Sequence, residues 1–386
     1  MTDQARRSLA PEMEERLDRM VRGLVETRGV RHAVVALGRS DGSPLWVGSA
    51  GAATETGAPL TADTPYFLAS VTKLFIATTT LRLVEQGRVA LDAPMSDYLP
   101  AELAGGLHLW QGVDRTADIT VRHLLGHATG LPDYLVIKPQ AGEALFDSIA
   151  GGTDRRWGMK EIADLVRDHG RPEFPPRPFD GQRHTIRYSG TNFQFLIAII
   201  EAVTGAPFED ALEELILGRL GLGNTFLPGS ASAAASKTVA SEAWIGDRRL
   251  DVLTTAMRCF RDLYSTTNDS LRFMAALVTG EAFDDPATAR LMTAHWNPLA
   301  FSPSLRPVAP GWPMEYGLGM IRVRVPRYLT PFRPIPEIVG HTGVTGSWLF
   351  HCPDLDVITA GTVDQATAAA LPYRFVPRLL RTLGDS

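Results

Sequence analysis

The chain has 386 residues, of which 45% are hydrophobic, so it can bury a large core, and its length favours two domains. Its net charge of −5 and the lack of a basic block argue against nucleic acid as a partner. No segment reaches the length of a transmembrane helix, and no apolar run follows Arg6-Arg7. The sequence therefore predicts a soluble, cytoplasmic protein without a membrane partner.

Cysteine and histidine spacing gives no metal site. Cys259 and Cys352 lie far apart, and neither is in a metal-ligand spacing. Buried free thiols are the default expectation for them, and a disulfide stays open. His123 and His127 are four residues apart, but no glutamate completes a metalloprotease pattern. We therefore expect no metal and no cofactor.

Apolar periodicity, caps and turn residues predict the elements in chain order. Helices are predicted over 11–27, 74–84, 121–125 (capped by Thr120), 161–168, 192–203, 207–220, 270–278 and 367–383. Strands are predicted over 32–38 and 45–48, joined by a turn at 40–43, and over 316–325, 347–352 and 357–361. Irregular surface loops are predicted over 171–187 and 229–240.

The order of these elements predicts an α+β fold. Strands lie at both ends of the chain and helices lie between them. The economical arrangement is an antiparallel sheet built from both termini and flanked by the terminal helices, with a large, mostly helical domain inserted. The expected domains are 1–75 with 305–386 for the sheet and 76–304 for the helices, with an active site between them.

Ser70 and Lys73 form the strongest chemical signal. Three residues apart at a predicted helix start, they share one face of the helix. The helix N-terminus favours an oxyanion and disfavours a protonated amine, so Lys73 is expected to be pushed toward the neutral base. Only four of the 38 basic residues are lysines, and lysine can give up its proton where arginine cannot. The pair predicts an activated serine nucleophile.

Three segments together carry a family resemblance. They are Ser70-x-x-Lys73, Tyr188-Ser189-Gly190 and His341-Thr342-Gly343. In this order they resemble the serine β-lactamase and penicillin-binding-protein superfamily. The branch most similar is that of class C β-lactamases, family VIII esterases and D-aminopeptidases, the S12 peptidase type. The stretches 91–94, 119–132, 264–273 and 316–319 also look like segments of that family.

The resemblance implies a β-lactamase-like fold and a role for each motif. Ser70 would be the acylated nucleophile, and Lys73 would help to remove its proton. Tyr188 would carry a proton to the leaving group. The backbone N–H groups of Ser70 and Val344 would form the oxyanion hole. Substrate contacts are expected from His341, Gly343, Asn192 and Trp348, although Trp348 could equally pack in the core.

Two positions depart from the family pattern. The second motif usually ends in asparagine, where this chain has Gly190, and Asn192 lies two residues further on. The third motif commonly begins with lysine, where this chain has His341. An imidazole with the ordinary pKa of about 6.5 is neutral at pH 7.5 and becomes cationic near pH 6. Both changes argue against β-lactamase activity more strongly than they argue against hydrolysis in general.

The expected function is a serine hydrolase that forms an acyl-enzyme on Ser70 and cleaves esters or amides of small molecules. One alternative is an acyltransferase on the same machinery, in which an alcohol or amine replaces water. Others are a D-aminopeptidase or a β-lactamase, and a non-catalytic binding scaffold is the remaining class. The sequence leaves the acyl group, the leaving group and the oligomeric state open.

Overall fold

The computed structural model describes residues 9–236, 238–301, 313–325 and 334–384. Its centre is a nine-stranded sheet in the order β2-β1-β15-β14-β13-β12-β11-β10-β6. The strands are β1 (Ala33–Gly38), β2 (Pro44–Ala50), β6 (Ile186–Arg187), β10 (Asn297–Ala300), β11 (Met314–Tyr316), β12 (Ile321–Val323), β13 (Ile338–Thr342), β14 (Trp348–Cys352) and β15 (Val357–Thr362). Neighbouring strands are antiparallel except β10 and β6, which are parallel. The predicted α+β class, with a mainly antiparallel sheet to which both ends of the chain contribute, is confirmed.

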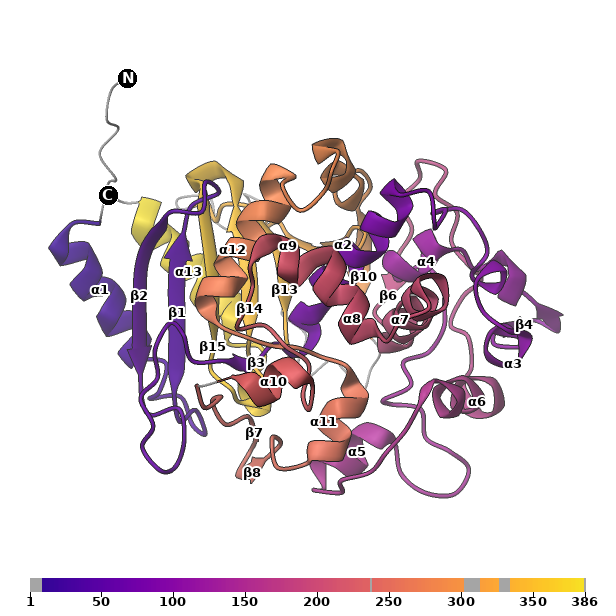
Figure 1. Cartoon of the computed structure of the whole chain (residues 1–386), viewed down its shortest axis with the longest axis horizontal. Helices are drawn as coiled ribbons and strands as arrows, with labels where there is room; N and C mark the ends of the chain where they lie inside the picture. Colours follow the sequence, from indigo (N-terminus) through magenta and orange to yellow (C-terminus); the bar gives the residue numbers. More distant parts are fainter. Residues whose placement is uncertain (1–8, 237, 302–312, 326–333, 385–386) are drawn as a thin grey trace.

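Helices cover both faces of this sheet. They are α1 (Pro11–Arg22), α2 (Thr72–Glu85), α3 (Ala101–Ala104), α4 (Val121–Leu125), α5 (Leu145–Ala150), α6 (Met159–His169), α7 (Gly190–Thr204), α8 (Phe208–Leu212), α9 (Gly218–Leu220), α10 (Ala231–Ala235), α11 (Thr254–Phe260), α12 (Thr267–Thr279) and α13 (Pro372–Gly384). The terminal helices α1 and α13 contact each other at the β2 end of the sheet (Figure 1). Helix α12 packs on β1, β14 and β15, and its Phe273 ring stacks on that of Phe75 in α2. None of the described helices is both long and apolar enough to cross a membrane.

Two-sided burial explains the first strand. All six residues of β1 are buried, so its sequence Ala-Val-Val-Ala-Leu-Gly is a continuous apolar run rather than an alternating one. Val34 and Ala36 face the larger core, which contains α2, α7 and α12. Val35 and Leu37 face a second core closed by α1 and α13. The sheet therefore separates two apolar layers, and the terminal helices flank it as predicted.

Helix α2 crosses the larger core almost fully buried, yet it carries three consecutive threonines. Their hydroxyls donate to the carbonyls four residues earlier, from Thr78 to Leu74 and from Thr79 to Phe75 at 2.8 Å, and from Thr80 to Ile76 at 2.9 Å. This back-bonding satisfies polar groups that would otherwise be costly in an apolar layer. A rigid helix inside the core is thus the support for Ser70 and Lys73.

Most predicted elements are present, with the following corrections. The predicted helix 11–27 ends at Arg22, and the predicted loop 171–187 ends in strand β6. The predicted strand 316–325 is two strands, β11 and β12, because Gly317 donates its N–H to Met320 and turns the chain between them. The predicted loop 229–240 contains α10, whose N-terminus is capped by the Ser230 hydroxyl; residue 237 lies outside the described residues. The predicted helix 207–220 is interrupted by a π-helical turn over Glu213–Leu217.

The domain boundaries stay a prediction. Strands β6 and β10 join the sheet from within the segment predicted to be helical, and α12 from the same segment packs on the sheet. The proposed boundary at residue 305 lies outside the described residues, as does Arg6-Arg7.

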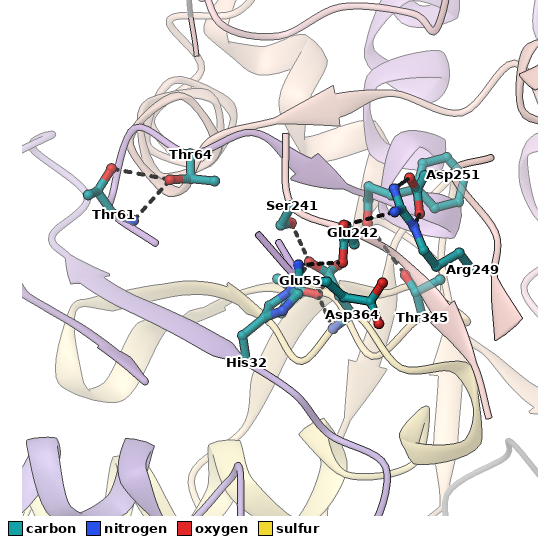
Figure 2. Close-up of polar contacts among 12 residues, drawn as sticks. His32, Glu55, Thr61, Thr64, Ser241, Glu242, Arg249, Asp251, Thr345 and Asp364 are labelled. Atoms are coloured by element: carbon teal, nitrogen blue, oxygen red, sulfur yellow. Dashed lines mark hydrogen bonds and ion pairs between the residues drawn. The ribbon is translucent and has the colours of Figure 1, made fainter. Parts of the chain in front are cut away.

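A buried polar cluster ties distant segments together beside the third motif. The Asp364 carboxylate accepts hydrogen bonds from His32 Nε2 at 2.8 Å, from Thr362 Oγ1 at 2.8 Å and from the Ser241 hydroxyl. All four side chains are buried, and Figure 2 shows His32 and Ser241 converging on Asp364. The next residue, Gln365, donates its N–H to the Thr345 carbonyl at 2.7 Å. The cluster thus fixes the loop that follows β13.

We expect Asp364→Ala to lower the free energy of unfolding by about 3–5 kcal/mol, because it leaves buried donors on three segments without their acceptor. Urea denaturation followed by circular dichroism measures this. The matched control is Glu15→Ala, which removes an exposed partner of Arg19 and should change stability by less than about 1 kcal/mol. Equal effects of the two substitutions would show that the cluster does not stabilise the fold.

Candidate active site

Ser70 sits on a strained turn at the start of α2. A 3-10 turn spans Ala69–Val71, and Ala69 has φ 46°, in the left-handed region that residues with a Cβ rarely adopt. The turn is held because Leu68 donates its N–H to the Leu263 carbonyl at 2.8 Å. Leu263 in turn donates to Thr72 Oγ1 at 2.9 Å. This turn presents Ser70 at the N-terminus of the helix, as its sequence position predicted.

Lys73 and Tyr188 converge on the Ser70 hydroxyl. Lys73 Nζ donates to Ser70 Oγ at 3.1 Å, and the Tyr188 hydroxyl donates to the same oxygen at 2.9 Å. Tyr188 is placed by the sheet, since its N–H donates to the Ala300 carbonyl at 3.0 Å and continues the pairing of β6 with β10. The structure therefore brings together the three residues that the motifs predicted to act jointly, although they are separated by up to 118 positions.

The predicted charge state of Lys73 is wrong. Burial lowers the pKa of Lys73, but the negative charges that Tyr188, Asp262 and Asp133 can carry outweigh it, so the pKa is raised above its ordinary value. Lys73 is therefore an ammonium in the resting site and donates to Ser70. These charges come from segments that the spacing argument did not include.

Tyr188 is buried among aromatic rings. Its ring lies 4.5 Å from the ring of His127 and 5.6 Å from that of Phe301. Burial raises the pKa of the Tyr188 phenol, while the Lys73 charge and the hydrogen bonds with Ser70 and Lys73 oppose the rise. Lys73 and Tyr188 are both protonated at neutral pH, so the pair must lose one proton before it can act as a base.

A cavity opens at Ser70. Its polar end is lined by Ser70, Lys73, Asp133, Tyr188, Asp262 and His341. Its other side is apolar and is lined by Leu135, Phe146, Ile149, Leu250, Met257 and Phe260, among others. These residues come from α5, α11 and the loops beside them. The arrangement offers a hydrophobic space next to a nucleophile, as binding sites for small molecules do.

Gly343 allows the end of β13 to approach the Ser70 turn. A Cβ at this position would lie 2.2 Å from Ser347 Oγ and 2.4 Å from the Leu68 carbonyl oxygen, so only glycine fits. Gly343 donates its N–H to Ser347 and Gly346 donates to Gly343, and Val344 lies between them on this turn. Ser70 and Val344 both border the cavity. Their assignment as oxyanion-hole donors stays a prediction.

His341 lines the cavity, but its predicted titration near pH 6 is wrong. Its Nδ1 lies 2.7 Å from the Thr342 carbonyl oxygen and must donate to it, so Nε2 accepts from the Tyr316 hydroxyl at 3.3 Å. Burial, with a smaller contribution from the Lys73 charge, lowers the pKa of His341 to about 3. His341 therefore stays a neutral imidazole throughout the pH range of an ordinary assay.

Asn192 does not take the place of the missing motif asparagine. Its side chain is fully buried, accepts from Thr129 Oγ1 at 2.8 Å and lies 3.0 Å from His127 Nδ1. A side chain at position 190 would instead meet the Asp133 carboxylate, at 3.3 Å from the Cβ. Two residues further along a helix the side chain points to another side, so the substrate contact predicted for Asn192 is wrong.

Trp348 does not line the cavity either. Its indole is 1% exposed, donates to Thr359 Oγ1 at 3.1 Å and packs near Phe375 of α13. Side chains alternate across a strand, and Trp348 points to the face covered by α1 and α13, whereas the Ser70 turn lies in the core of the other face. The alternative given by the sequence, packing in the core, is the one observed.

The sequence motifs missed the two carboxylates of the cavity. Asp133 follows the family-like stretch that ends at Pro132, and Asp262 lies two residues before the stretch that begins at Tyr264. Each is an acidic residue next to a segment that resembles the family, and this position was the available signal. Both carboxyls have a raised pKa because they are buried, and that of Asp262 is about 6.

Comparison with known proteins gives the same assignment as the motifs. Esterase EstB of Burkholderia gladioli is 31% identical over 219 residues, which are 55% of this chain and 51% of the esterase. The chain thus matches about half the length of this relative. A D-stereospecific amidohydrolase from Streptomyces sp. has a TM-score of 0.68 and 26% identity, over 94% of this chain and 97% of that protein.

Another structure supports the fold alone. A D-amino acid amidase from Ochrobactrum anthropi SV3 has a TM-score of 0.74 at 22% identity, covering 97% of this chain and 99% of its own. The family model described as beta-lactamase matches residues 17–373, nearly the whole chain. The chain therefore belongs to the beta-lactamase family.

Proposed function

We propose that this protein is a serine hydrolase that forms an acyl-enzyme on Ser70 and cleaves esters or amides of small molecules. The single observation that carries the proposal is the Ser70 hydroxyl, which accepts hydrogen bonds from both Lys73 and Tyr188 at the mouth of an apolar cavity. The esterase and amidohydrolase relatives support the same class of reaction.

In the proposed first step, Ser70 Oγ attacks the substrate carbonyl carbon and its proton passes to the Lys73–Tyr188 pair in its basic form. The N–H groups of Ser70 and Val344 stabilise the oxygen that becomes negative. The bond to the leaving group breaks when Tyr188 returns a proton to it. Water then repeats the sequence on the acyl-enzyme and releases the acid. Neutral His341 supplies no cation to this site.

We also propose a cytoplasmic location. Cys259 and Cys352 are both free in the structure, as is usual for proteins of a reducing compartment. Cell fractionation of a tagged chain tests this directly.

Labelling tests the nucleophile. We expect a fluorophosphonate to add one adduct mass, on the peptide that contains Ser70, because the hydroxyl is hydrogen-bonded by both partners and borders the cavity. Peptide mapping by mass spectrometry measures this, and Ser70→Ala is the control. An adduct on another peptide, or equal labelling of Ser70→Ala, would rule out Ser70 as the nucleophile.

We expect kcat/KM for p-nitrophenyl butyrate to exceed that for nitrocefin by about two orders of magnitude. The drug carries a carboxylate, for which a charged hydrogen-bond partner is worth about 1.5–3 kcal/mol, or about 10–150-fold. His341 is neutral here, and Asp133 and Asp262 add negative charge to the same cavity. A simple ester needs no such partner.

The same comparison at pH 6 and pH 7.5 is a further check. Because the pKa of His341 lies near 3, acidification to pH 6 leaves its charge unchanged and the preference for the ester should persist. Nitrocefin turnover comparable with that of the ester at pH 7.5 would show that this interpretation of His341 is wrong.

A further inference from the structure

A buried histidine lies behind the Tyr188 phenol. Two residues after α4, His127 has φ 52°, in the left-handed region that is uncommon for residues other than glycine, and its side chain is fully buried. Helices α4 and α7 contact each other, so the turn after α4 lies against the start of α7, the helix that follows Tyr188 (Figure 1). The catalytic steps proposed above use Tyr188 but not His127.

Hydrogen bonds fix the proton of this imidazole on Nε2. Thr129 Oγ1 donates to Asn192 Oδ1 at 2.8 Å, so the amide nitrogen of Asn192 faces His127 and donates to Nδ1 at 3.0 Å. The Ser189 N–H donates to the same nitrogen at 3.3 Å. Nδ1 is therefore the acceptor and Nε2 carries the proton. Burial, with a smaller contribution from the Lys73 charge, lowers the pKa of His127 well below its ordinary value, so the ring is neutral.

Tyr188 is held at both ends of its backbone. Its own N–H donates to the Ala300 carbonyl at 3.0 Å, and the N–H of the next residue, Ser189, donates to His127. The imidazole also packs on the Tyr188 ring, with 4.5 Å between the ring centroids. His127 therefore contacts Tyr188 through the peptide that follows it and through its ring.

The imidazole is itself held by other rings and lies away from the substrate space. Its centroid is 4.5 Å from that of Tyr316 and 5.2 Å from that of Phe193. Of the described residues, those that line the cavity at Ser70 include Tyr188 but not His127. Any effect of His127 on the reaction therefore passes through the residues that it contacts.

We infer that His127 is a positioning residue for Tyr188: its Nδ1 fixes the peptide that follows Tyr188 and so keeps the phenol on Ser70 Oγ. The inference rests on the proposed function, because it requires that the phenol transfers protons in acylation. The Tyr188 hydroxyl lies 2.9 Å from Ser70 Oγ. A shift of about 1 Å breaks this contact and can cost about 10²-fold in rate.

Two substitutions separate the acceptor of His127 from its ring. His127→Phe keeps an aromatic ring but leaves the Ser189 N–H and the Asn192 amide without their acceptor. We expect it to lower kcat for p-nitrophenyl butyrate by about 10²-fold, with KM nearly unchanged. His127→Asn places an amide oxygen where Nδ1 lies and tolerates the left-handed backbone. Its kcat should stay at least about tenfold above that of His127→Phe.

A wild-type kcat in His127→Phe, or an equal loss in the two variants, would overturn the inference. A loss confined to KM would make His127 a determinant of the shape of the cavity and would also reject it. The control is His169→Phe, at the exposed end of α6, which should leave kcat unchanged. Melting temperatures show whether each variant is folded.

A double-mutant cycle then tests whether His127 acts through Tyr188. In Tyr188→Phe the hydroxyl is already absent, so the additional change His127→Phe should lower kcat by less than about threefold. The same loss in both backgrounds would show a purely structural role and would reject the inference. If His127→Phe is unfolded at the assay temperature, His127→Gly takes its place in the cycle, since glycine adopts this backbone without strain.

Failure of the proposed function has a different signature. In that case Ser70→Ala would hydrolyse p-nitrophenyl butyrate as fast as the wild-type protein does, whatever the variants of His127 show. If Ser70→Ala is inactive and the cycle is additive, the proposed function stands and the role of His127 is rejected.

Discussion

Lys73→Arg is expected to lower kcat/KM for p-nitrophenyl butyrate by about 10²–10⁴-fold, the usual cost of losing general-base help. Arginine keeps the positive charge and can still donate to Ser70, but it cannot be deprotonated in a protein. The substitution therefore removes proton transfer while it preserves the charge that Asp133 and Asp262 face.

The matched control is Lys160→Arg, on the exposed side of α6, where the lysine only pairs with Asp164. It should leave kcat/KM unchanged. If Lys73→Arg kept more than about a tenth of the wild-type value, Lys73 would act by its charge and not as a base.

The pH profile separates the two roles further. The pKa of Lys73 is raised from 10.5, so the neutral amine becomes more abundant as the pH rises toward that value. The wild-type kcat/KM should therefore increase with pH across the neutral and mildly alkaline range, after subtraction of the rate of Ser70→Ala. In Lys73→Arg this increase should be lost. A flat wild-type profile would mean that the base is already formed at neutral pH.

The candidate catalytic group was predictable because its geometry is mostly local. Ser70 lies in the 3-10 turn that leads directly into α2, and Lys73 lies in the first turn of α2. A spacing of three residues brings their side chains together in any fold that keeps this turn and helix. Tyr188 was identified only through the order of the three motifs, since its position depends on the pairing of β6 with β10. A parallel pairing that joins only two residues of each strand leaves no periodic pattern in a sequence.

Charge states could not be predicted in the same way. From the sequence alone, His341 and Lys73 can be assigned only the reference pKa values of their side chains. In the structure, burial and groups from other segments shift both pKa values. Asp262 is 189 residues from Lys73, so the sequence did not indicate that the two interact. The role of Trp348 stayed open for a simpler reason. The sequence does not specify which face of the sheet carries the site, so it does not show whether a given strand residue lines the site or packs on the opposite face.

Tyr188→Phe is expected to fold normally and to lose about 10²–10⁴-fold in kcat, because it removes the hydroxyl that donates to Ser70 and that we propose protonates the leaving group. The ring contacts with His127 and Phe301 remain, so the melting temperature should stay close to that of wild type. The matched control is Tyr98→Phe, which removes a hydroxyl bonded to the Ala90 N–H and should keep full activity.

The leaving group decides which proton transfer Tyr188 performs. p-Nitrophenolate departs without a proton, whereas an ethoxide or an anilide must be protonated as the bond breaks. If Tyr188 returns the proton, Tyr188→Phe should reduce kcat/KM more for ethyl butyrate than for p-nitrophenyl butyrate. An equal loss on both esters would mean that Tyr188 acts only in the step in which Ser70 attacks the substrate. Its phenol, held close to the Lys73 ammonium, would then take part in removing the serine proton. Unchanged kcat on both would remove Tyr188 from the mechanism and leave the lysine as the sole proton carrier.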